Sequence, residues 1–220
     1  MIVVHHLNNS RSQRILWLLE ELNLPYKIKF YERDKKTMLA PKALQEIHPL
    51  GKSPILTDAG ITVAESGAII EYLIEKYDKG KLRPPLGTSE SRQYVYWLHY
   101  AEGSAMSPLL LSLIFSKIES TPLPFFARPV LKMISNQVKK VFIRPQLKLH
   151  FDFIEQSLKK SLWFAGAHFS AADIQMSFPL EASLGRSLQN SYPHIQEFVK
   201  KIRSRPAYIK ALEKGGPFVL

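Results

Sequence analysis

Three short stretches of the chain hold the side chains that could do chemistry. Ser10 and Ser12 stand where an apolar run gives way to a helical pattern. A Ser-Pro pair at 53–54 opens an apolar stretch, and a Glu-Ser pair at 65–66 precedes a second helical pattern. Hydroxyl groups, a carboxylate and the free N–H groups of helix starts are groups that bind small charged ligands.

Ser10 allows two interpretations. Its hydroxyl fits a helix cap, with Gln13 completing a capping box. The same hydroxyl could instead donate to a thiolate, together with the N–H groups and the positive end of the helix. Because the chain has no cysteine, the sulfur of any thiol chemistry must come from a substrate. The residues alone leave both interpretations open.

The Ser-Pro and Glu-Ser pairs also allow two interpretations each. A cis bond before Pro54 would turn the backbone of Ser53 outward, toward an extended peptide-like ligand, whereas a trans bond would only open a strand. Ser66 fits a helix N-cap, so the N–H groups behind it could bind a carboxylate. Glu65 beside them could bind an ammonium group. Together they suit an α-amino acid group, and plain capping is the alternative.

A fourth motif, "FSAADIQMSFPLE", has a structural interpretation. Ser170 and Asp173 form an S-x-x-D capping box at the start of a helix. The spacing then predicts that Ile174, Met176 and Phe178 are buried.

Composition limits the class of protein. The chain has 220 residues and is 45% apolar, which is enough for a packed core. Its seven histidines show no metal-ligand spacing, so no metal site is predicted. The longest strongly apolar stretch, 108–115, is too short to span a bilayer. The first residues lack the pattern of a secretory signal, so a cytoplasmic location is expected.

The net charge of +11 is unevenly distributed. Residues 1–80 hold 11 basic and 10 acidic side chains, so nearly all of the excess lies in residues 81–220. This asymmetry between the two parts of the chain indicates two structural units. A basic half could attract nucleic acid, acidic lipid or anionic substrates. The basic residues follow no recognition motif, so a solvated basic surface is favoured and no nucleic-acid partner is predicted.

The first part of the chain alternates strands with helices. Strands are predicted at 1–7, 26–32, 53–58 and 61–65, and helices at 12–24, 40–47 and 66–77. Parallel pairing at the start and a hairpin near the end would give a four-stranded sheet covered by helices.

The second part reads as entirely helical. A segment rich in Gly, Pro, Lys and Ser separates it from the sheet. The fold class is therefore α/β followed by all-α. The predicted domains are 1–80 and 90–220, joined by a linker at 81–89.

The motifs in this order resemble a cytosolic glutathione transferase over nearly the whole chain. The pieces are "NNSRSQR", "HPLGKSPIL", "ESGAIIEYL", the linker near residue 80 and "FSAADI". The resemblance implies a thioredoxin-like first domain with a cis proline, here Pro54. It also implies a helical second domain and a homodimer.

The resemblance further implies a glutathione site. Lys52, Ser53 and Pro54 would hold the glutathione backbone, and Glu65 and Ser66 would hold its γ-glutamyl end.

The catalytic position is implied in the same way. Ser10 would be the thiolate-activating hydroxyl of the serine classes, four residues before Arg14. Asn9 or Ser12 takes that place if the loop is shifted by one or two residues.

The implied activity is conjugation of the glutathione thiolate to hydrophobic electrophiles, with reduction of organic hydroperoxides as a second reaction. Glutathione is then a co-substrate, and no cofactor is expected. The helices around 95–125 and the tail 215–220 would line the electrophile pocket. The alternative is a non-catalytic module of the same fold that serves binding or assembly.

The segment 117–160 resembles a fungal and bacterial branch of the family with an extended helical domain. It is basic and aromatic. It could lie on anionic lipid or supply a hydrophobic wall for the electrophile, and the wall is favoured.

Overall fold

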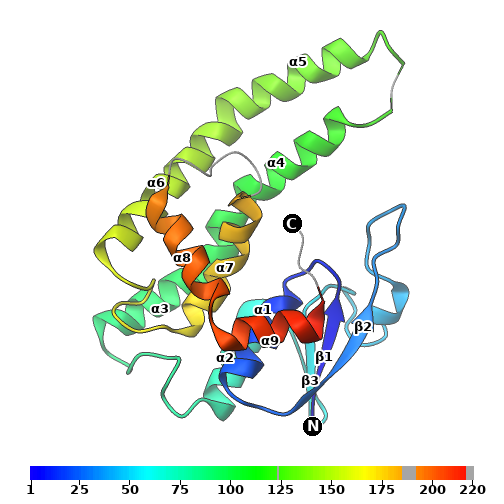
Figure 1. Ribbon diagram of the computed structural model, residues 1–220. Coiled ribbons are helices and arrows are strands. Elements are labelled where there is room, and N and C mark those ends of the chain that lie inside the picture. Colours follow the sequence, from blue (N-terminus) through cyan, green and yellow to red (C-terminus); the bar gives the residue numbers. More distant parts are fainter. Residues whose placement is uncertain (123, 185–191, 217–220) are drawn as a thin grey trace.

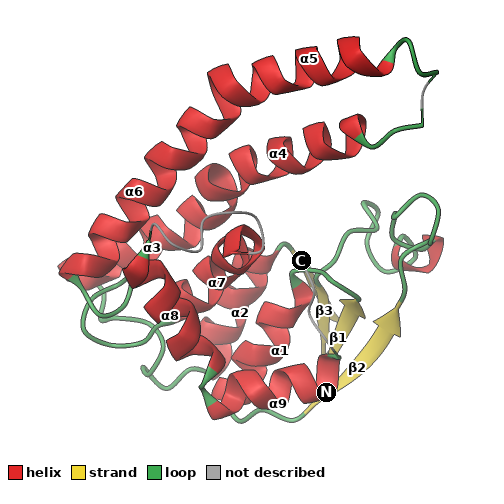
Figure 2. Ribbon diagram, turned by 45° about the horizontal axis from the view of Figure 1, so that its top comes forward, coloured by secondary structure: helices red, strands yellow, loops and turns green. Residues whose placement is uncertain are grey.

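The structure of the chain is a computed structural model that describes residues 1–122, 124–184 and 192–216 (Figure 1). A small sheet lies at one end of the molecule, and helices form the rest (Figures 1 and 2). Two long helices extend from the helical part as an arm (Figure 1).

The sheet has four strands in the order β2-β1-β3-β4. They are β1 (Ile2–Leu7), β2 (Tyr26–Tyr31), β3 (Ile55–Asp58) and β4 (Ile61–Ala64). Strand β1 pairs in parallel with β2 and antiparallel with β3, and β3 and β4 form a hairpin. The predicted parallel start and terminal hairpin are confirmed.

Two helices and one short turn accompany the sheet. They are α1 (Ser12–Glu21), the 3-10 turn η1 (Lys42–Leu44) and α2 (Ser66–Tyr77). The helix predicted at 40–47 was too long, because prolines at 41 and 49 leave room for one turn only.

Every regular element of the described chain from residue 89 onward is helical, as predicted. Thr88 caps the first helix, since its side-chain oxygen accepts the Ser91 N–H at 3.1 Å. The helices are α3 (Ser89–Tyr100), α4 (Met106–Glu119), α5 (Arg128–Val138), α6 (Arg144–Lys160), α7 (Ala171–Leu184), α8 (Pro193–Arg203) and α9 (Pro206–Gly215).

Two π-helical turns lie where the arm meets the body. The turn η2 (Ala101–Ala105) joins α3 to α4, and η3 (Lys139–Ile143) joins α5 to α6. The sequence did not predict either turn, because the residues on both sides of each turn keep helical spacing and read as one continuous helix.

The arm consists of α4 and α5, which run side by side away from the body (Figures 1 and 2). Helix α4 ends and helix α5 begins at its tip (Figure 1). The Glu119 carboxylate ties the two helices together, because it accepts from the Ser135 hydroxyl at 2.7 Å and from Lys139 Nζ at 2.8 Å. Apolar side chains on α5 stay largely exposed, among them Met133 at 65%.

Two apolar clusters cover the two faces of the sheet. On one face, Ile2 and Val4 pack into a core that continues through α1 and α2 into the helical part. On the other face, Leu7, Tyr31 and Leu44 form the centre of a smaller cluster. The larger core crosses from the sheet to the helices, so it fixes the two parts relative to each other.

One half of the capping box predicted at the start of α7 is formed. The Asp173 carboxylate accepts the Ser170 N–H at 2.8 Å and its hydroxyl at 3.0 Å. Ile174, Met176 and Phe178 are buried, as the spacing predicts.

No described helix is both long enough and apolar enough to cross a membrane. Within residues 1–122, 124–184 and 192–216, no three His, Cys, Asp or Glu side chains gather in a way that could hold a metal ion.

Candidate active site

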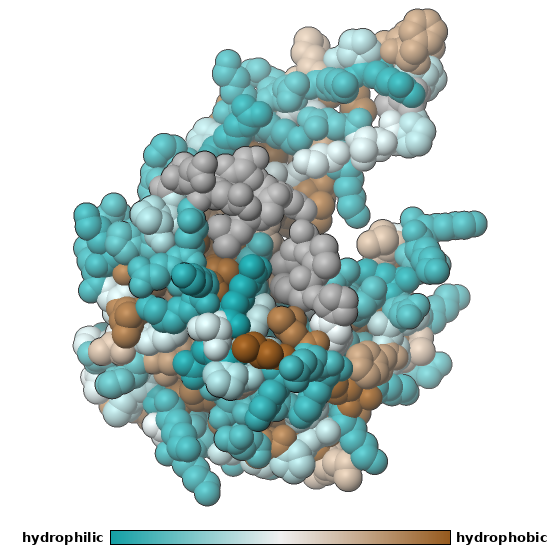
Figure 3. Space-filling view, in the orientation of Figure 1, coloured by the Kyte–Doolittle hydropathy of each residue, from teal (hydrophilic) through white to brown (hydrophobic). Residues whose placement is uncertain are grey.

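A cleft of about 780 Å³ opens between the sheet and the base of the arm. Figure 3 shows the hollow beneath the arm on that side of the molecule. Three of its walls come from chain segments far apart in sequence: the turn after β1, the segments around 52–54 and 64–66, and the helices α4 and α7. The motifs predicted to carry the chemistry therefore meet at one place.

All five residues predicted for the glutathione site line this cleft. They are Lys52, Ser53, Pro54, Glu65 and Ser66. The Ser53-Pro54 bond is cis, as the resemblance implies.

The start of α2 differs in one respect from the sequence prediction. Glu65, not Ser66, is the N-cap residue, and Ser66 is the first residue of the helix. Glu65 has a φ of 71°, a region that residues other than glycine rarely adopt. Such a backbone costs on the order of 1–3 kcal/mol and is found where a site demands it. Here it leaves the Glu65 side chain exposed at the cleft.

Two buried side chains hold the hydroxyl of Ser66. Its Oγ accepts from Gln175 Nε2 at 3.1 Å and from Arg14 Nη1 at 3.4 Å. Both neighbours act as donors, so the hydroxyl keeps its own proton for an acceptor in the cleft. The residue is 2% exposed, so this hydroxyl is fixed in place.

Ser10 and Ser12 lie beneath the cleft surface. Ser10 is 4% exposed, and Ser12 is completely buried. The Ser10 Oγ lies 2.7 Å from the Ser12 Oγ and 3.1 Å from the Ser53 Oγ. Of these three serines, Ser53 is the one that lines the cleft.

The capping box predicted for Ser10 and Gln13 is not formed. Helix α1 begins at Ser12, and its N-cap is Arg11, without a side-chain cap. The Ser10 Oγ accepts the Ser12 N–H at 3.2 Å instead. The reason is the turn at Asn9, whose φ of 48° places Ser10 before the cap position. Ser10 still satisfies one of the first N–H groups of the helix.

Asn9 and Arg11 reach the cleft from this turn. Asn9 is one of the two alternates that the sequence offers for the catalytic position. The Asn9 carbonyl accepts from Arg33 Nη2 at 3.4 Å, which ties the turn to the segment after β2. The two residues that flank Ser10 therefore line the cleft, whereas Ser10 lies behind them.

A charge cluster that sequence reasoning missed joins the two parts of the molecule. Glu102, in the π-turn η2, accepts from Arg14 Nη1 at 2.5 Å and from Arg11 Nε at 2.8 and 2.9 Å. Both guanidinium groups also stack on the Phe178 ring, at 4.7 and 4.9 Å from its centroid. One signal was available: Arg14 is a charged residue on the apolar face of a helix, where it requires a buried partner.

Burial and pairing act against each other in this cluster. Burial lowers the pKa of Arg14 to about 10, and the carboxylate of Glu102 opposes that shift. Burial alone would raise the pKa of Glu102, but the two arginines more than offset it and lower the pKa. The pair therefore stays ionised around neutral pH.

The wall formed by α4 and α7 is apolar. Met106, Leu109, Leu110 and Leu113 form one stripe along α4, and Phe178 on α7 continues it. Opposite them lie Met38, Leu39 and Leu50, from the connection between β2 and β3. This connection was not predicted as part of the site.

The helices predicted around 95–125 contribute residues to the cleft, and most of the predicted tail 215–220 lies outside the described part of the chain. The stripe on α4 falls within the predicted helices around 95–125. Gly215 and Gly216 are absent from the described lining, and residues 217–220 lie outside the described part of the chain. Of the basic segment 117–160, Lys117 is the one described residue that reaches the cleft, so the wall expected from this segment lies earlier in the chain.

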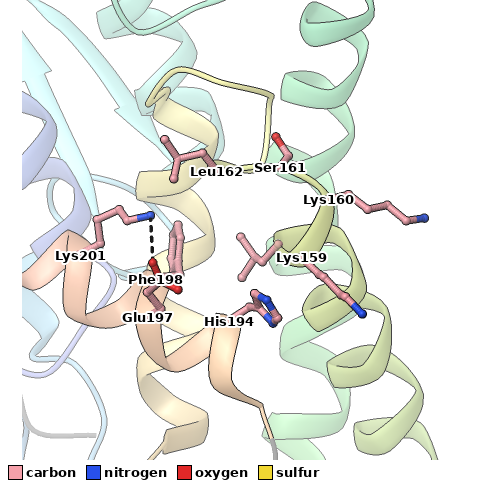
Figure 4. A pocket seen from close by; sticks show the side chains of 9 residues that line it. Lys159, Lys160, Ser161, Leu162, His194, Glu197, Phe198 and Lys201 are labelled. Carbon is pink, nitrogen blue, oxygen red and sulfur yellow. Dashed lines mark ion pairs between the residues drawn. The ribbon is translucent and has the colours of Figure 1, made fainter.

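A second hollow of about 250 Å³ lies between the end of α6 and α8 (Figure 4). Lys159, Lys160 and His194 stand at its rim, and Lys201 pairs with Glu197 at 3.9 Å. It is open to solvent and holds none of the residues with predicted chemistry, so the first cleft is the candidate active site.

Comparison with known proteins points to one family. The model of the glutathione S-transferase N-terminal domain matches residues 1–75, and that of the C-terminal domain matches 130–206. Glutathione S-transferase 3 of Schizosaccharomyces pombe is 39% identical over 97% of this chain and 88% of its own. Glutathione S-transferase 1 of Saccharomyces cerevisiae is 34% identical over 98% and 95%.

Solved structures agree with these sequence matches. The crystal structure of a glutathione S-transferase from Actinobacillus pleuropneumoniae has a TM-score of 0.81 at 35% identity, covering 99% of this chain and 94% of that one. A glutathione transferase from Phanerochaete chrysosporium, solved with oxidized glutathione, has a TM-score of 0.75 at 24% identity and covers 97% and 96%. The second likeness concerns the fold alone.

Proposed function

The chain belongs to the glutathione S-transferase family and acts as a glutathione transferase, and from this premise we propose how its cleft binds glutathione and activates the thiol. One observation carries the proposal: the cis-proline segment, the start of α2 and the turn before α1 all line the same cleft.

The γ-glutamyl end of glutathione binds at the start of α2. It carries one ammonium and one carboxylate group. The exposed carboxylate of Glu65 would take the ammonium group. The first N–H groups of α2 and the hydroxyl of Ser66 would take the carboxylate, because a helix start favours an anion. The bonds from Arg14 and Gln175 fix that hydroxyl before the ligand arrives.

The rest of glutathione extends along the segment 52–54 toward α1. Ser53 and Pro54 would pair with the peptide backbone, as an added strand does. Lys52, which is exposed at the cleft, would meet the glycyl carboxylate. The thiol then lies near the turn that holds Asn9 and Ser10.

Ser10 would stabilise the thiolate together with Ser53, which lies 3.1 Å away at the cleft surface. One unit of thiol pKa corresponds to about 1.4 kcal/mol. A hydrogen bond to a charged group contributes roughly 1.5–3 kcal/mol, so one such bond suffices to ionise a thiol whose free pKa is about 8.5. Asn9, on the cleft surface, is the alternative donor.

The apolar stripe on α4 would receive the electrophile. Its side chains favour a hydrophobic compound that reacts with the thiolate at the boundary between the polar and apolar walls. The same thiolate could reduce an organic hydroperoxide. Glutathione is then a co-substrate, and no further cofactor is required.

The test is an ultraviolet titration of the thiolate of bound glutathione in the wild type, Ser10→Ala and Asn9→Ala. In the wild type we expect the thiol of bound glutathione to have a pKa below that of free glutathione. In Ser10→Ala we expect this pKa to return toward the free value. A reversal in Asn9→Ala alone would move the role to Asn9. A wild type that binds glutathione with the thiol titrating as it does in water would contradict thiolate stabilisation.

Three further properties extend this proposal. The chain would divide into a glutathione domain at 1–80, a linker at 81–89 and an electrophile domain at 90–220. It would form a homodimer, which light scattering at several protein concentrations tests. It would reside in the cytoplasm, which cell fractionation tests.

A further inference from the structure

One buried histidine has no part in the site described above. Every second side chain of β1 lies on the face of the sheet that is turned toward α1 and α9. These side chains are Ile2, Val4 and His6. His6 is 3% exposed. An imidazole at the third position of an apolar row requires partners for both ring nitrogens.

A chain of hydroxyl groups joins this imidazole to the cleft. The His6 Nδ1 lies 2.9 Å from the Ser12 Oγ, which lies 2.7 Å from the Ser10 Oγ. The Ser10 Oγ lies 3.1 Å from the Ser53 Oγ. Ser53 lines the cleft, so the chain is unbroken from the ligand site to the ring.

The surroundings of the ring give this chain a direction. Gly215, in α9, lies close to the ring, and its backbone raises the pKa of the imidazole. Since Nδ1 faces Ser12, we assign this backbone interaction, and with it the ring proton, to Nε2. Nδ1 is then the acceptor, so Ser12 donates to it and Ser10 donates to Ser12. The hydroxyl protons of the two serines therefore point inward, away from the cleft.

The ring starts neutral, and its protonation depends on the negative charge of the thiolate that forms at the other end of the chain. Burial lowers the pKa of His6, and the bond to Gly215 opposes that shift, so the imidazole is neutral at physiological pH. The groups packed against it are Phe30 on β2, Ser12 on α1 and Gly215 on α9, and none of the three is charged.

We propose that His6 takes up the proton that leaves the glutathione thiol, by way of Ser53, Ser10 and Ser12. The proposal rests on the thiol position assigned under the proposed function. The S–H bond breaks, its electron pair stays on the sulfur, and its proton passes to the Ser53 oxygen. The Ser53 proton turns from the His5 carbonyl, which lies 3.3 Å from its Oγ, to the Ser10 oxygen. Ser10 and Ser12 then each hand on their own proton, and that of Ser12 goes to the Nδ1 of His6.

The transfer leaves a thiolate and an imidazolium, with no proton lost to solvent. It also reverses every hydroxyl, so that Ser53 now donates to the thiolate. When the sulfur has reacted, the imidazolium returns its proton along the same path to the product or to solvent. His6 is thus a positioning residue that acts through the serines and never touches the substrate.

Nuclear magnetic resonance of the imidazole nitrogens provides the first test. The wild-type protein is observed free, with glutathione, and with S-methylglutathione, which has no thiol proton. At a pH where the bound thiol is ionised, we expect His6 to be protonated with glutathione and neutral in the other two samples. A neutral His6 beside an ionised bound thiol would overturn the relay and leave the glutathione site intact.

Two variants give a second test. His6→Asn keeps an acceptor near the position of Nδ1 but cannot be protonated, and Ser12→Ala interrupts the chain while His6 stays. In both we expect the pKa of the bound thiol to rise by about one unit or more, with glutathione affinity changed by less than about twofold. His5→Asn is the matched control, because His5 contacts Tyr31 and Thr57 on the other face of β1.

Proton release on binding separates the remaining outcomes. Calorimetry in buffers of different ionisation enthalpy counts the protons that leave the complex. We expect no release in the wild type and about one per thiolate in any variant that still ionises the thiol. Release of one proton by the wild type would contradict the relay. Failure of the wild type to bind glutathione at all would overturn the proposed function itself, and the relay with it.

Discussion

The two walls of the cleft are built in different ways. On the glutathione wall, the hydroxyls of Ser10 and Ser66 are buried and held by neighbours at 2.7–3.4 Å. On the electrophile wall, Leu110 is 51% exposed, and Leu50 opposite it is 63% exposed. Under the proposed function, the first wall would recognise one invariant ligand, glutathione, with fixed polar groups. The second offers apolar area without fixed partners, which suits variable ligands.

The largest effect is expected at Arg14, the buried side chain that bonds Ser66 in the polar wall. In Arg14→Leu the Glu102 carboxylate loses its buried partner, and Ser66 loses a donor. We expect the free energy of unfolding to fall by about 3–5 kcal/mol, measured by urea denaturation. Glutathione affinity should fall as well. Arg92→Leu, at an exposed site on α3, is the control. If the free energy of unfolding fell equally in Arg14→Leu and Arg92→Leu, the buried pairing of Arg14 would contribute nothing to stability.

The next test removes one fixed hydroxyl from the polar wall. Ser66→Ala should raise the dissociation constant of glutathione about 10- to 150-fold, because the hydrogen bond to its carboxylate is lost. Isothermal calorimetry measures this. The KM of the electrophile should hardly change. Ser177→Ala removes an equally buried hydroxyl, which donates to the Ile174 carbonyl, and should leave the affinity unchanged.

Ser10 tests whether the polar wall also does chemistry. In Ser10→Ala we expect turnover to fall roughly 10- to 100-fold with little change in glutathione affinity, because Ser10 lies beneath the cleft surface and acts on the ionisation of the thiol rather than on the rest of glutathione. Steady-state kinetics with saturating glutathione measures the effect. An unchanged turnover would assign the role to Asn9, Ser12 or backbone groups.

The smallest effect is expected on the apolar wall. Leu110→Ala should lower kcat/KM about 3- to 10-fold for a bulky electrophile. The effect is small because only about half of the Leu110 surface is exposed and can contact a ligand. A small electrophile and the affinity for glutathione should be unaffected. Leu149→Ala, an exposed leucine on α6 outside the cleft, serves as the control. A loss of glutathione affinity in Leu110→Ala would show that the two walls do not bind their ligands independently.

Local pattern was sufficient for most of the fold. Alternating apolar residues gave all four strands, and helical spacing gave α1, α2 and the helical second half. Helix starts were less reliable. The φ of 48° at Asn9 and of 71° at Glu65 each moved a cap away from the serine that local preference selects. Asparagine adopts positive φ more readily than most residues, so its type gave a signal at position 9, whereas the type of Glu65 gave none and its backbone is set by the surrounding structure.

The site was predictable in part for a related reason. Lys52, Ser53 and Glu65 stand within motifs, so their position at the cleft could be expected. Arg11 and Glu102 come from segments 91 residues apart and carry no motif of their own. Their meeting depends on how the helical part packs against the sheet, which spacing along the chain does not describe.

The two π-turns at the base of the arm have a consequence for how such a cleft can change over generations. A π-turn holds one residue more than the α-helix around it accommodates. Deleting one residue from 101–105 would restore a regular helix, and the helix after it would keep its rotation, because the bulge already absorbs the extra residue. The stripe of Leu109 and Leu113 would still face the cleft, and the change would fall on Glu102, which lies inside the turn and pairs with Arg11 and Arg14. A single in-frame codon deletion could thereby alter the support of the polar wall and leave the apolar wall in place.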